Sequence, residues 1–181
     1  MRSRFSKKQM RTDDADKGPA TPEQIRARTF QRAAKLLAAK PRTIAELRER
    51  LLERRGVSKT LVEEVIARLK EYGYLDDQRF AVSYGSSKVK QRPIGRRRLQ
   101  LDLKMKQVPS AIAAEALDTI YAETSEDELI DRAIEKRIRL RGKPTTRLEA
   151  KSLFDHLLRQ GFSFELVSDK VRRLAKADLD E

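Results

Sequence analysis

The sequence predicts an all-α protein made of three tandem three-helix repeats. Apolar residues recur at helical spacing in three separate stretches, and the same order of proline, leucine pair and turn precedes each stretch. No stretch shows the strict alternation of apolar and polar residues that is typical of a half-buried strand. Because one repeat offers few apolar residues for a core of its own, we expect neighbouring repeats to stack into an elongated, curved solenoid.

The third helix of each expected repeat is marked by four apolar residues at offsets of 0, 4, 9 and 12. At about 100° per residue these offsets lie on one stripe, as in an amphipathic helix. Ser58, Pro109 and Ser163 directly follow the first residue of each stripe and are typical of helix starts. The stripes are Val57, Leu61, Ile66 and Leu69; Val108, Ile112, Leu117 and Ile120; and Phe162, Leu166, Val171 and Leu174.

The middle helix of each repeat carries two leucines four residues apart, which lie on one helix face. Gly56 and Gly161 follow the first and last pairs and favour the left-handed turn that commonly ends a helix. Gln107 stands at the corresponding place in the second repeat, where a residue other than glycine makes such a turn more costly. The pairs are Leu47 with Leu51, Leu99 with Leu103, and Leu153 with Leu157.

Prolines separate each middle helix from a first helix, since proline is excluded from helix interiors. The prolines are Pro41, Pro93 and Pro144, and the first helices are expected over residues 24–39, 77–91 and 126–140.

Four segments follow from this pattern. Residues 1–20 hold six basic and three acidic residues and few apolar ones, which predicts a disordered basic tail. The repeats are expected over residues 21–74, 75–121 and 122–181.

Composition narrows the class of function. The net charge of +13 favours either a polyanion or an acidic protein groove as partner. The chain has no cysteine, so disulfides and thiolate sites are excluded, and the N-terminus has no apolar region behind its charged start. No apolar run approaches the roughly 20 residues of a membrane span. We therefore expect a cytoplasmic, monomeric protein that is neither secreted nor inserted in a membrane.

Residues suited to catalysis are scarce. His156 is the single histidine, so a histidine-based metal site or triad is not expected. The segment 142–145 has glycine, lysine and threonine but lacks the first glycine of a phosphate loop, and Pro144 removes a backbone donor. Adjacent carboxylates such as Asp76 and Asp77 do not face each other on a helix. We expect no enzyme activity, no metal and no cofactor.

A distinctive motif joins the first repeat to the second. Gly73 is placed to end one helix, Asp76 to cap the next, and Asp77 to lie near the positive end of its dipole. Apolar and aromatic side chains of the motif are expected to pack at the join, so the motif is interpreted as setting the angle between repeats. Its residues are Gly73, Tyr74, Leu75, Asp76, Asp77, Arg79 and Phe80.

Over roughly residues 30–175, and most specifically around this motif, the sequence resembles the RecX family of regulators of the RecA recombinase. The resemblance implies a protein that lies in the groove of the RecA filament on single-stranded DNA. It also implies restraint of ATP hydrolysis, strand exchange and repressor cleavage in DNA repair and the SOS response. Some members of the family bind DNA directly.

The densest positive charge lies between residues 86 and 106, where eight basic residues accompany Asp102 alone. Relative to the leucines of this middle helix, Arg96, Arg97 and Lys104 are expected on one adjacent face, while Leu101 and Met105 project away from the core. A solvated helix face normally mixes charges of both signs, so we predict a binding surface. The eight residues are Lys88, Lys90, Arg92, Arg96, Arg97, Arg98, Lys104 and Lys106.

The binding partner stays open at this point. Arginines fork equally well onto acidic side chains of RecA and onto phosphates. A second hypothesis is therefore a helical repeat protein that binds DNA or RNA directly, although ten aromatic residues, mostly on core stripes, argue against base stacking. A third is a scaffold for another acidic protein. Elsewhere in the chain, pairs along one helix such as Glu46 with Arg50 are expected.

Overall fold

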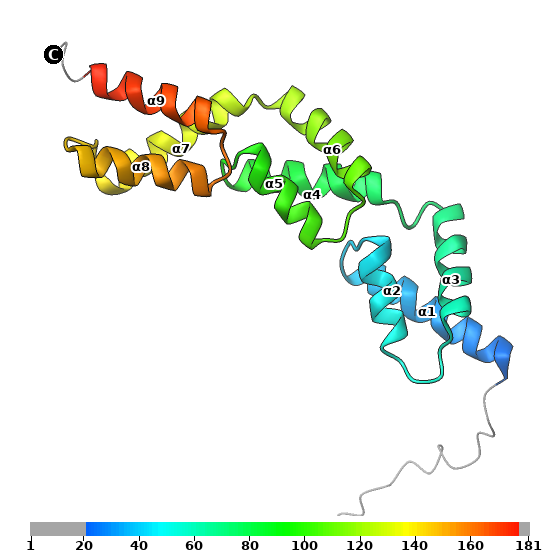
Figure 1. Ribbon diagram of the computed structural model, residues 1–181. Helices are drawn as coiled ribbons and strands as arrows, with labels where there is room; N and C mark the ends of the chain where they lie inside the picture. Colours follow the sequence, from blue (N-terminus) through cyan, green and yellow to red (C-terminus); the bar gives the residue numbers. More distant parts are fainter. Residues whose placement is uncertain (1–20, 178–181) are drawn as a thin grey trace, which may run out of the picture.

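Figure 1 shows the computed structural model, which describes residues 21–177. Over this range the chain forms nine helices and no strand, so the all-α prediction is confirmed. The tail predicted over residues 1–20 lies outside the described range. The helices are α1 (Pro22–Ala39), α2 (Ile44–Leu52), α3 (Lys59–Glu71), α4 (Asp77–Gln91), α5 (Arg96–Met105), α6 (Ser110–Glu123), α7 (Glu126–Arg141), α8 (Arg147–Arg159) and α9 (Phe164–Ala177).

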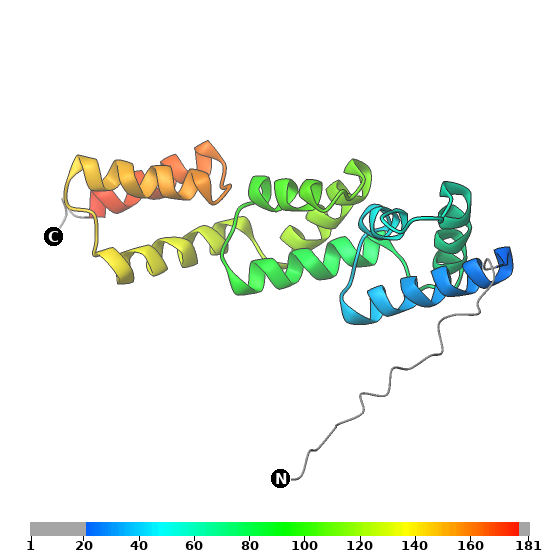
Figure 2. The ribbon, with the colours of Figure 1, turned by 90° about the horizontal axis from the view of Figure 1, so that it is seen from below.

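The helices form three groups of three that follow one another in a curved row. In Figures 1 and 2 the group α1–α3 lies at one end, α4–α6 in the middle and α7–α9 at the other end. The predicted elongated series of three-helix repeats is therefore confirmed. The first helices of the groups, α1, α4 and α7, begin and end within two residues of the predicted limits.

Side-chain caps and prolines set the helix limits. Thr21, Thr43 and Thr146 form capping boxes, in which the hydroxyl accepts from the backbone of the third helical residue, whose side chain accepts from the cap backbone. The three predicted prolines lie in the loops before α2, α5 and α8, where they leave the helical hydrogen bonds intact.

The turns at Gly56 and Gly161 are left-handed, as predicted, and the turn at Gln107 is left-handed as well. Gly56 and Gly161 have φ of 80° and 90°, and Gln107 has φ of 57°. The cost of Gln107 in this conformation is offset by its side chain, whose Nε2 donates to Glu49 Oε1 at 2.7 Å. The glutamine that departs from the pattern thus makes a contact with the first repeat that glycine lacks.

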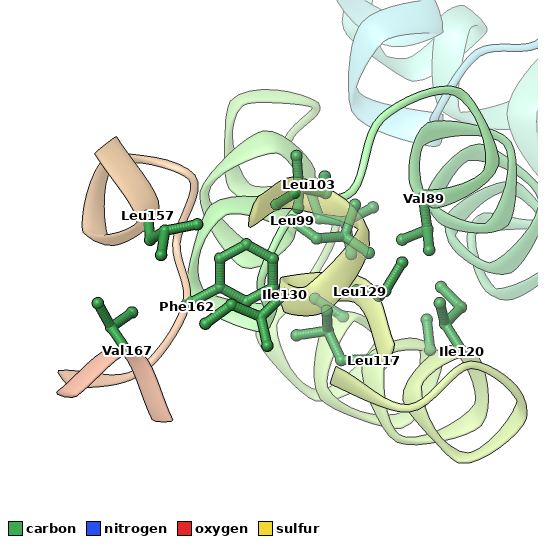
Figure 3. Close-up of a cluster of buried hydrophobic side chains, with 14 of the residues drawn as sticks. Val89, Leu99, Leu103, Leu117, Ile120, Leu129, Ile130, Leu157, Phe162 and Val167 are labelled. Carbon is green, nitrogen blue, oxygen red and sulfur yellow. The ribbon is translucent and has the colours of Figure 1, made fainter. Parts of the chain in front are cut away.

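The repeats do not share cores in the way the sequence predicted. Helices α1–α3 enclose a core of their own, which includes Leu47, Leu51 and Val62 and is closed by Leu75 after α3. The second and third repeats instead share one continuous cluster. Figure 3 shows side chains of both repeats gathered around the Phe162 ring.

The predicted apolar stripes are correct in register but incomplete. Val62, Ala113 and Val167, at offset 5 of each stripe, are buried. Ile112 and Leu166, at offset 4, are only partly buried. The buried position at offset 5 was not predicted, because the second repeat has a small alanine there. Large apolar residues therefore do not recur at this offset in all three repeats.

The joint between the second and third repeats is a close contact of two backbones. Gly95 N donates to Gln160 O at 2.9 Å, and Arg97 N donates to Gly161 O at 3.2 Å. A Cβ on Gly95 would lie 2.3 Å from the carbonyl of Gly161. Only glycine at position 95 permits this approach, which brings Phe162 into the shared core.

Replacing Gly95 with alanine should destabilise the joined second and third repeats by roughly 3 kcal/mol, because a backbone group cannot move aside as a side chain does. Gly56→Ala is the matched control: no atom lies within 4 Å of the place its new Cβ would take, so only the left-handed φ is penalised, by about 1 kcal/mol. Urea unfolding followed by circular dichroism measures both. Equal losses in the two variants would contradict the close-contact account.

Candidate binding surface at the first two repeats

The joint between the first and second repeats is made of polar contacts. Thr43 Oγ1 donates to Lys106 O at 2.9 Å, and Ile44 N donates to Asp77 Oδ1 at 2.9 Å. Lys106 Nζ pairs with Glu46 Oε1 at 2.7 Å. These contacts hold the start of α2 against the start of α4 and the end of α5.

The expected pair of Glu46 with Arg50 does not form, because both side chains have other partners. Glu46 binds Lys106 of the second repeat, and Arg50 pairs with Glu53 at 3.0 Å. Burial by itself raises the pKa of the Glu46 carboxyl, but the hydrogen bond and charge of Lys106, together with the Thr43 N–H, outweigh it, so the pKa lies below its ordinary value.

Gly73 and Asp76 have the local roles predicted from the motif. Gly73, with φ of 69°, follows the end of α3. Asp76 caps α4: its Oδ1 accepts from Gln78 N at 2.8 Å and from Arg79 N at 3.0 Å. Leu75 is buried in the core of the first repeat. These three residues therefore set the path of the chain between repeats.

Three other residues of the motif, Asp77, Tyr74 and Phe80, differ from their predicted roles. Asp77 is buried and accepts the Ile44 N–H across the joint, and burial raises the pKa of its carboxyl despite that hydrogen bond. Tyr74 is 66% exposed, so its predicted packing at the join is wrong. Phe80 is partly buried but stacks on Tyr84 of its own helix, with ring centroids 5.6 Å apart.

A cleft of about 690 Å³ opens beside this joint. One wall is the loop after α1, the other is a face of α4, and the end of α5 completes it. Asp76 is the one acid among its lining residues, which lie within the described range. The basic lining residues are Lys40, Arg42, Arg79, Lys88 and Lys106.

The structure divides the eight predicted basic residues. Four of them are engaged in ion pairs: Lys88 and Arg98 each lie 3.4 Å from Asp102, Arg96 pairs with Asp118 of α6, and Lys106 pairs with Glu46. The other four form no ion pair with any residue in the described range and point to solvent. They are Lys90, Arg92, Arg97 and Lys104.

Arg96 does not belong with Arg97 and Lys104, although the sequence placed all three on one face. Its side chain turns toward Asp118, and its backbone N–H donates to Glu126 Oε1 at 2.9 Å. Arg96 therefore serves the packing of α5 against its neighbours.

The outer face of α5, as we call the surface formed by Arg97, Leu101, Lys104 and Met105, is basic and apolar together. Leu101 is 56% and Met105 81% exposed. Spacings of three and four residues place the two cations beside the apolar pair. This confirms the projection of Leu101 and Met105 away from the core.

Comparison of the repeats shows that this apolar pair is peculiar to the second one. Aligned on the buried leucines, position 101 corresponds to Glu49 and Asp155, and position 105 to Glu53 and Arg159. Charged residues are thus the rule at these solvent-facing places. The two exposed apolar side chains at these places therefore make this face a candidate contact surface for a partner.

Lys40 and Arg42 of the cleft were not among the predicted site residues. They belong to the first repeat, far in sequence from the dense basic stretch, and only the bend between repeats brings them near Lys88 and Lys106. Their position on either side of Pro41 is the one signal in the sequence, since a loop proline exposes its neighbours.

The remaining features of the described range concern metal binding, its histidine and the apolarity of its helices. Residues 21–177 contain no group of three or more histidine or carboxylate side chains arranged to hold a metal ion. His156 is partly buried on α8, and burial, followed by the charges of Arg137, Arg159 and Arg141, lowers its pKa. No described helix is long and apolar enough to span a membrane.

We expect Asp76→Ala to lower the free energy of unfolding by about 1 kcal/mol, because the first turn of α4 loses its cap. Thermal and urea unfolding measure the loss. An unchanged stability would show that water replaces the carboxylate without cost.

Glu46→Gln should lower the free energy of unfolding by about 1 kcal/mol at neutral pH, because the charged pair across the joint is lost. The pKa of Glu46 is lowered in the folded state, so its contribution is present above the unfolded pKa and disappears as the pH falls through the folded value. The two proteins should therefore converge in stability once the pH falls below the lowered pKa of the folded protein, where Glu46 is protonated.

Glu53→Gln, which removes an exposed pair on the same helix, is the control and should change stability by less than about 0.5 kcal/mol. A difference between wild type and Glu46→Gln that persists undiminished in acid would contradict the assignment.

Comparisons with known proteins agree on one family. A family model described as the first three-helix domain of RecX matches residues 30–69, and one described as the second three-helix domain matches residues 76–117. The crystal structure of RecX from Lactobacillus salivarius superposes with a TM-score of 0.75 at 21% identity, covering 84% of this chain and 98% of that one. This likeness supports the fold.

Sequence relatives extend the match beyond these domains. Regulatory protein RecX of Chlorobium limicola is 34% identical over 144 residues, which cover 78% of this chain and 86% of that protein. The Thermobifida fusca protein of the same name is 31% identical, covering 89% and 86%. The chain spans about half, 52%, of the Bacillus licheniformis relative, at 30% identity. This similarity over most of both chains shows that the protein belongs to the RecX family of regulatory proteins.

Proposed function

We propose that this chain regulates the RecA recombinase by binding in the groove of the RecA filament on single-stranded DNA. There it mostly inhibits ATP hydrolysis, strand exchange and co-protease activity, and so acts in DNA repair and the SOS response. Membership of the RecX family supports RecA as the partner. The elongated, curved row of repeats suits a helical groove, because it offers a long face to successive subunits (Figure 2).

The observation that carries the proposal is the outer face of α5. Arg97 and Lys104 have no ionic partner in the described part of the chain, and Leu101 and Met105 lie exposed between and beside them. A surface of this kind suits a protein partner that offers carboxylates around an apolar contact. Phosphates would engage the cations alone and leave the apolar pair in water.

Direct binding of DNA or RNA is the second candidate. Lys90 and Arg92, at the end of α4, add two exposed cations to those of α5, which favours phosphate contacts. Binding through phosphates weakens steeply as the salt concentration rises, whereas binding that includes apolar contacts weakens less. The two candidates therefore differ in salt dependence.

The double variant Arg97→Glu/Lys104→Glu should lose inhibition of the RecA ATPase on single-stranded DNA. Glutamate is a good helix former and both positions lie off the core, so the fold is preserved. Attraction becomes repulsion, and we expect binding to weaken by roughly 3 kcal/mol. Arg96 is left unchanged because reversing its charge would disturb its pair with Asp118.

Arg132→Glu/Lys136→Glu is the matched control, because it makes the same charge change at exposed positions of α7. Binding to free DNA is measured in parallel for both variants. Loss of RecA inhibition with DNA binding retained would support the protein partner, and loss of DNA binding with inhibition retained would favour the second candidate. Full inhibition by the folded α5 variant would show that another surface binds RecA.

A further inference from the structure

We propose that the cleft between the first and second repeats is a separate binding site for a short, carboxylate-rich peptide segment. The site lies beside the polar joint, and neither the family match nor the outer face of α5 assigns it a role. The proposal does not depend on RecA being the partner. It follows from the charge, the stacking and the shape of the cleft.

The charge of the cleft is strongly one-sided. Five basic side chains line it, from the loop after α1, from α4 and from the end of α5. The one acid of the lining, Asp76, is engaged in capping α4. Lys88 and Lys106 are already paired with Asp102 and Glu46, which lie outside the lining. An anionic ligand therefore meets the uncompensated charge of Lys40, Arg42 and Arg79.

Two of the cations, Arg79 and Arg42, are held in place by contacts that leave donors available. Arg79 Nη2 donates to Gly73 O at 2.7 Å, and Arg42 Nε donates to Leu36 O at 3.4 Å. A guanidinium has five N–H donors, so most of those on each arginine remain for a ligand. Side chains fixed in this way lose less conformational entropy when they bind.

The wall that α4 contributes to the cleft is a stripe made of Phe80, Ser83, Tyr84 and Ser87. The small serines beside the stacked rings offer hydroxyls to a peptide backbone. The volume of about 690 Å³ falls within the range of sites that enclose small ligands, which suits a few residues of chain.

The arrangement of the rings favours a peptide over a single-stranded nucleic acid. One face of Tyr84 is stacked on Phe80, with an interplanar angle of 10°, and Lys88 Nζ lies over the Tyr84 ring, 5.4 Å from its centroid. A base needs a free aromatic face for stacking, and Tyr84 has none to offer. The rings instead form an apolar wall for aliphatic side chains.

The site also bridges two parts of the molecule that have separate cores. Lys40 and Arg42 belong to the first repeat, whereas Arg79 and Lys88 belong to the second. A peptide that contacts both sets links the two repeats. Peptide binding should therefore raise the melting temperature, because only the joined state offers the whole site.

The test measures fluorescence anisotropy of a labelled peptide of glutamates interrupted by two leucines, titrated with the full chain at about 150 mM salt. A labelled oligothymidylate is titrated in parallel. Lys40→Glu/Ser83→Glu places negative charge on both walls, at exposed positions without ionic partners in the described range. We expect it to weaken peptide binding at least about tenfold.

Gln31→Glu/Lys35→Glu on α1 makes the same total charge change outside the cleft and should leave peptide affinity within about twofold. Ser83→Trp fills the cleft without changing charge and should also abolish binding, while circular dichroism verifies that each variant is folded. RecA is absent from this assay, so its outcome is separate from that of the regulatory proposal.

Three results would overturn the site: no binding of the peptide to the wild-type chain, equal losses in the cleft and control variants, or full binding by folded Ser83→Trp. Binding of the oligothymidylate alone, lost in the cleft variant, would identify a nucleic-acid site instead.

Discussion

A hydrogen bond between a carboxylate at the start of one repeat and the backbone at the start of the preceding middle helix organises the whole chain. Asp77 accepts from Ile44 N, and Glu126 accepts from Arg96 N, both at 2.9 Å. The first N–H groups of a helix have no partner within it, so a neighbouring repeat can supply one. The same contact, made twice, sets the position of each repeat on the last and produces the extended row seen in Figure 1.

Around this shared contact the two joints differ in physical character. At the second joint Gly95 and Gly161 bring two backbones together, and an apolar core runs through to Phe162. At the first joint polar groups meet: Lys106 with Glu46, and Gln107 with Glu49. Burial of apolar surface resists opening more than polar pairs do, because water can replace a polar partner, so we expect the first joint to be the weaker of the two. The proposed peptide site lies beside this weaker joint, where a ligand has the greatest effect on the relation of the repeats.

The basic residues serve two purposes that their density in the sequence conceals. Lys88, Arg96 and Lys106 compensate carboxylates that hold helices and repeats together. Arg97 and Lys104 have no such task and accompany an exposed apolar pair. Structural and solvent-facing cations alternate within a few residues along α5, because successive residues on a helix point in different directions. The regulation proposed for this RecX-family protein thus rests on a small part of its total charge.

Much of the fold was predictable because its causes are local. Proline breaks, leucine pairs, caps such as Asp76 and the left-handed turns at Gly56 and Gly161 depend on neighbouring residues. The proline breaks and leucine pairs recur in all three repeats. The exposure of Arg97 and Lys104 was predictable in the same way, from helical spacing. The partners of Arg96 and Glu46, the burial of Asp77 and the cleft formed with Lys40 and Arg42 were not. They depend on the angle between repeats, and that angle is set by contacts between residues tens of positions apart, which no local pattern in the sequence encodes.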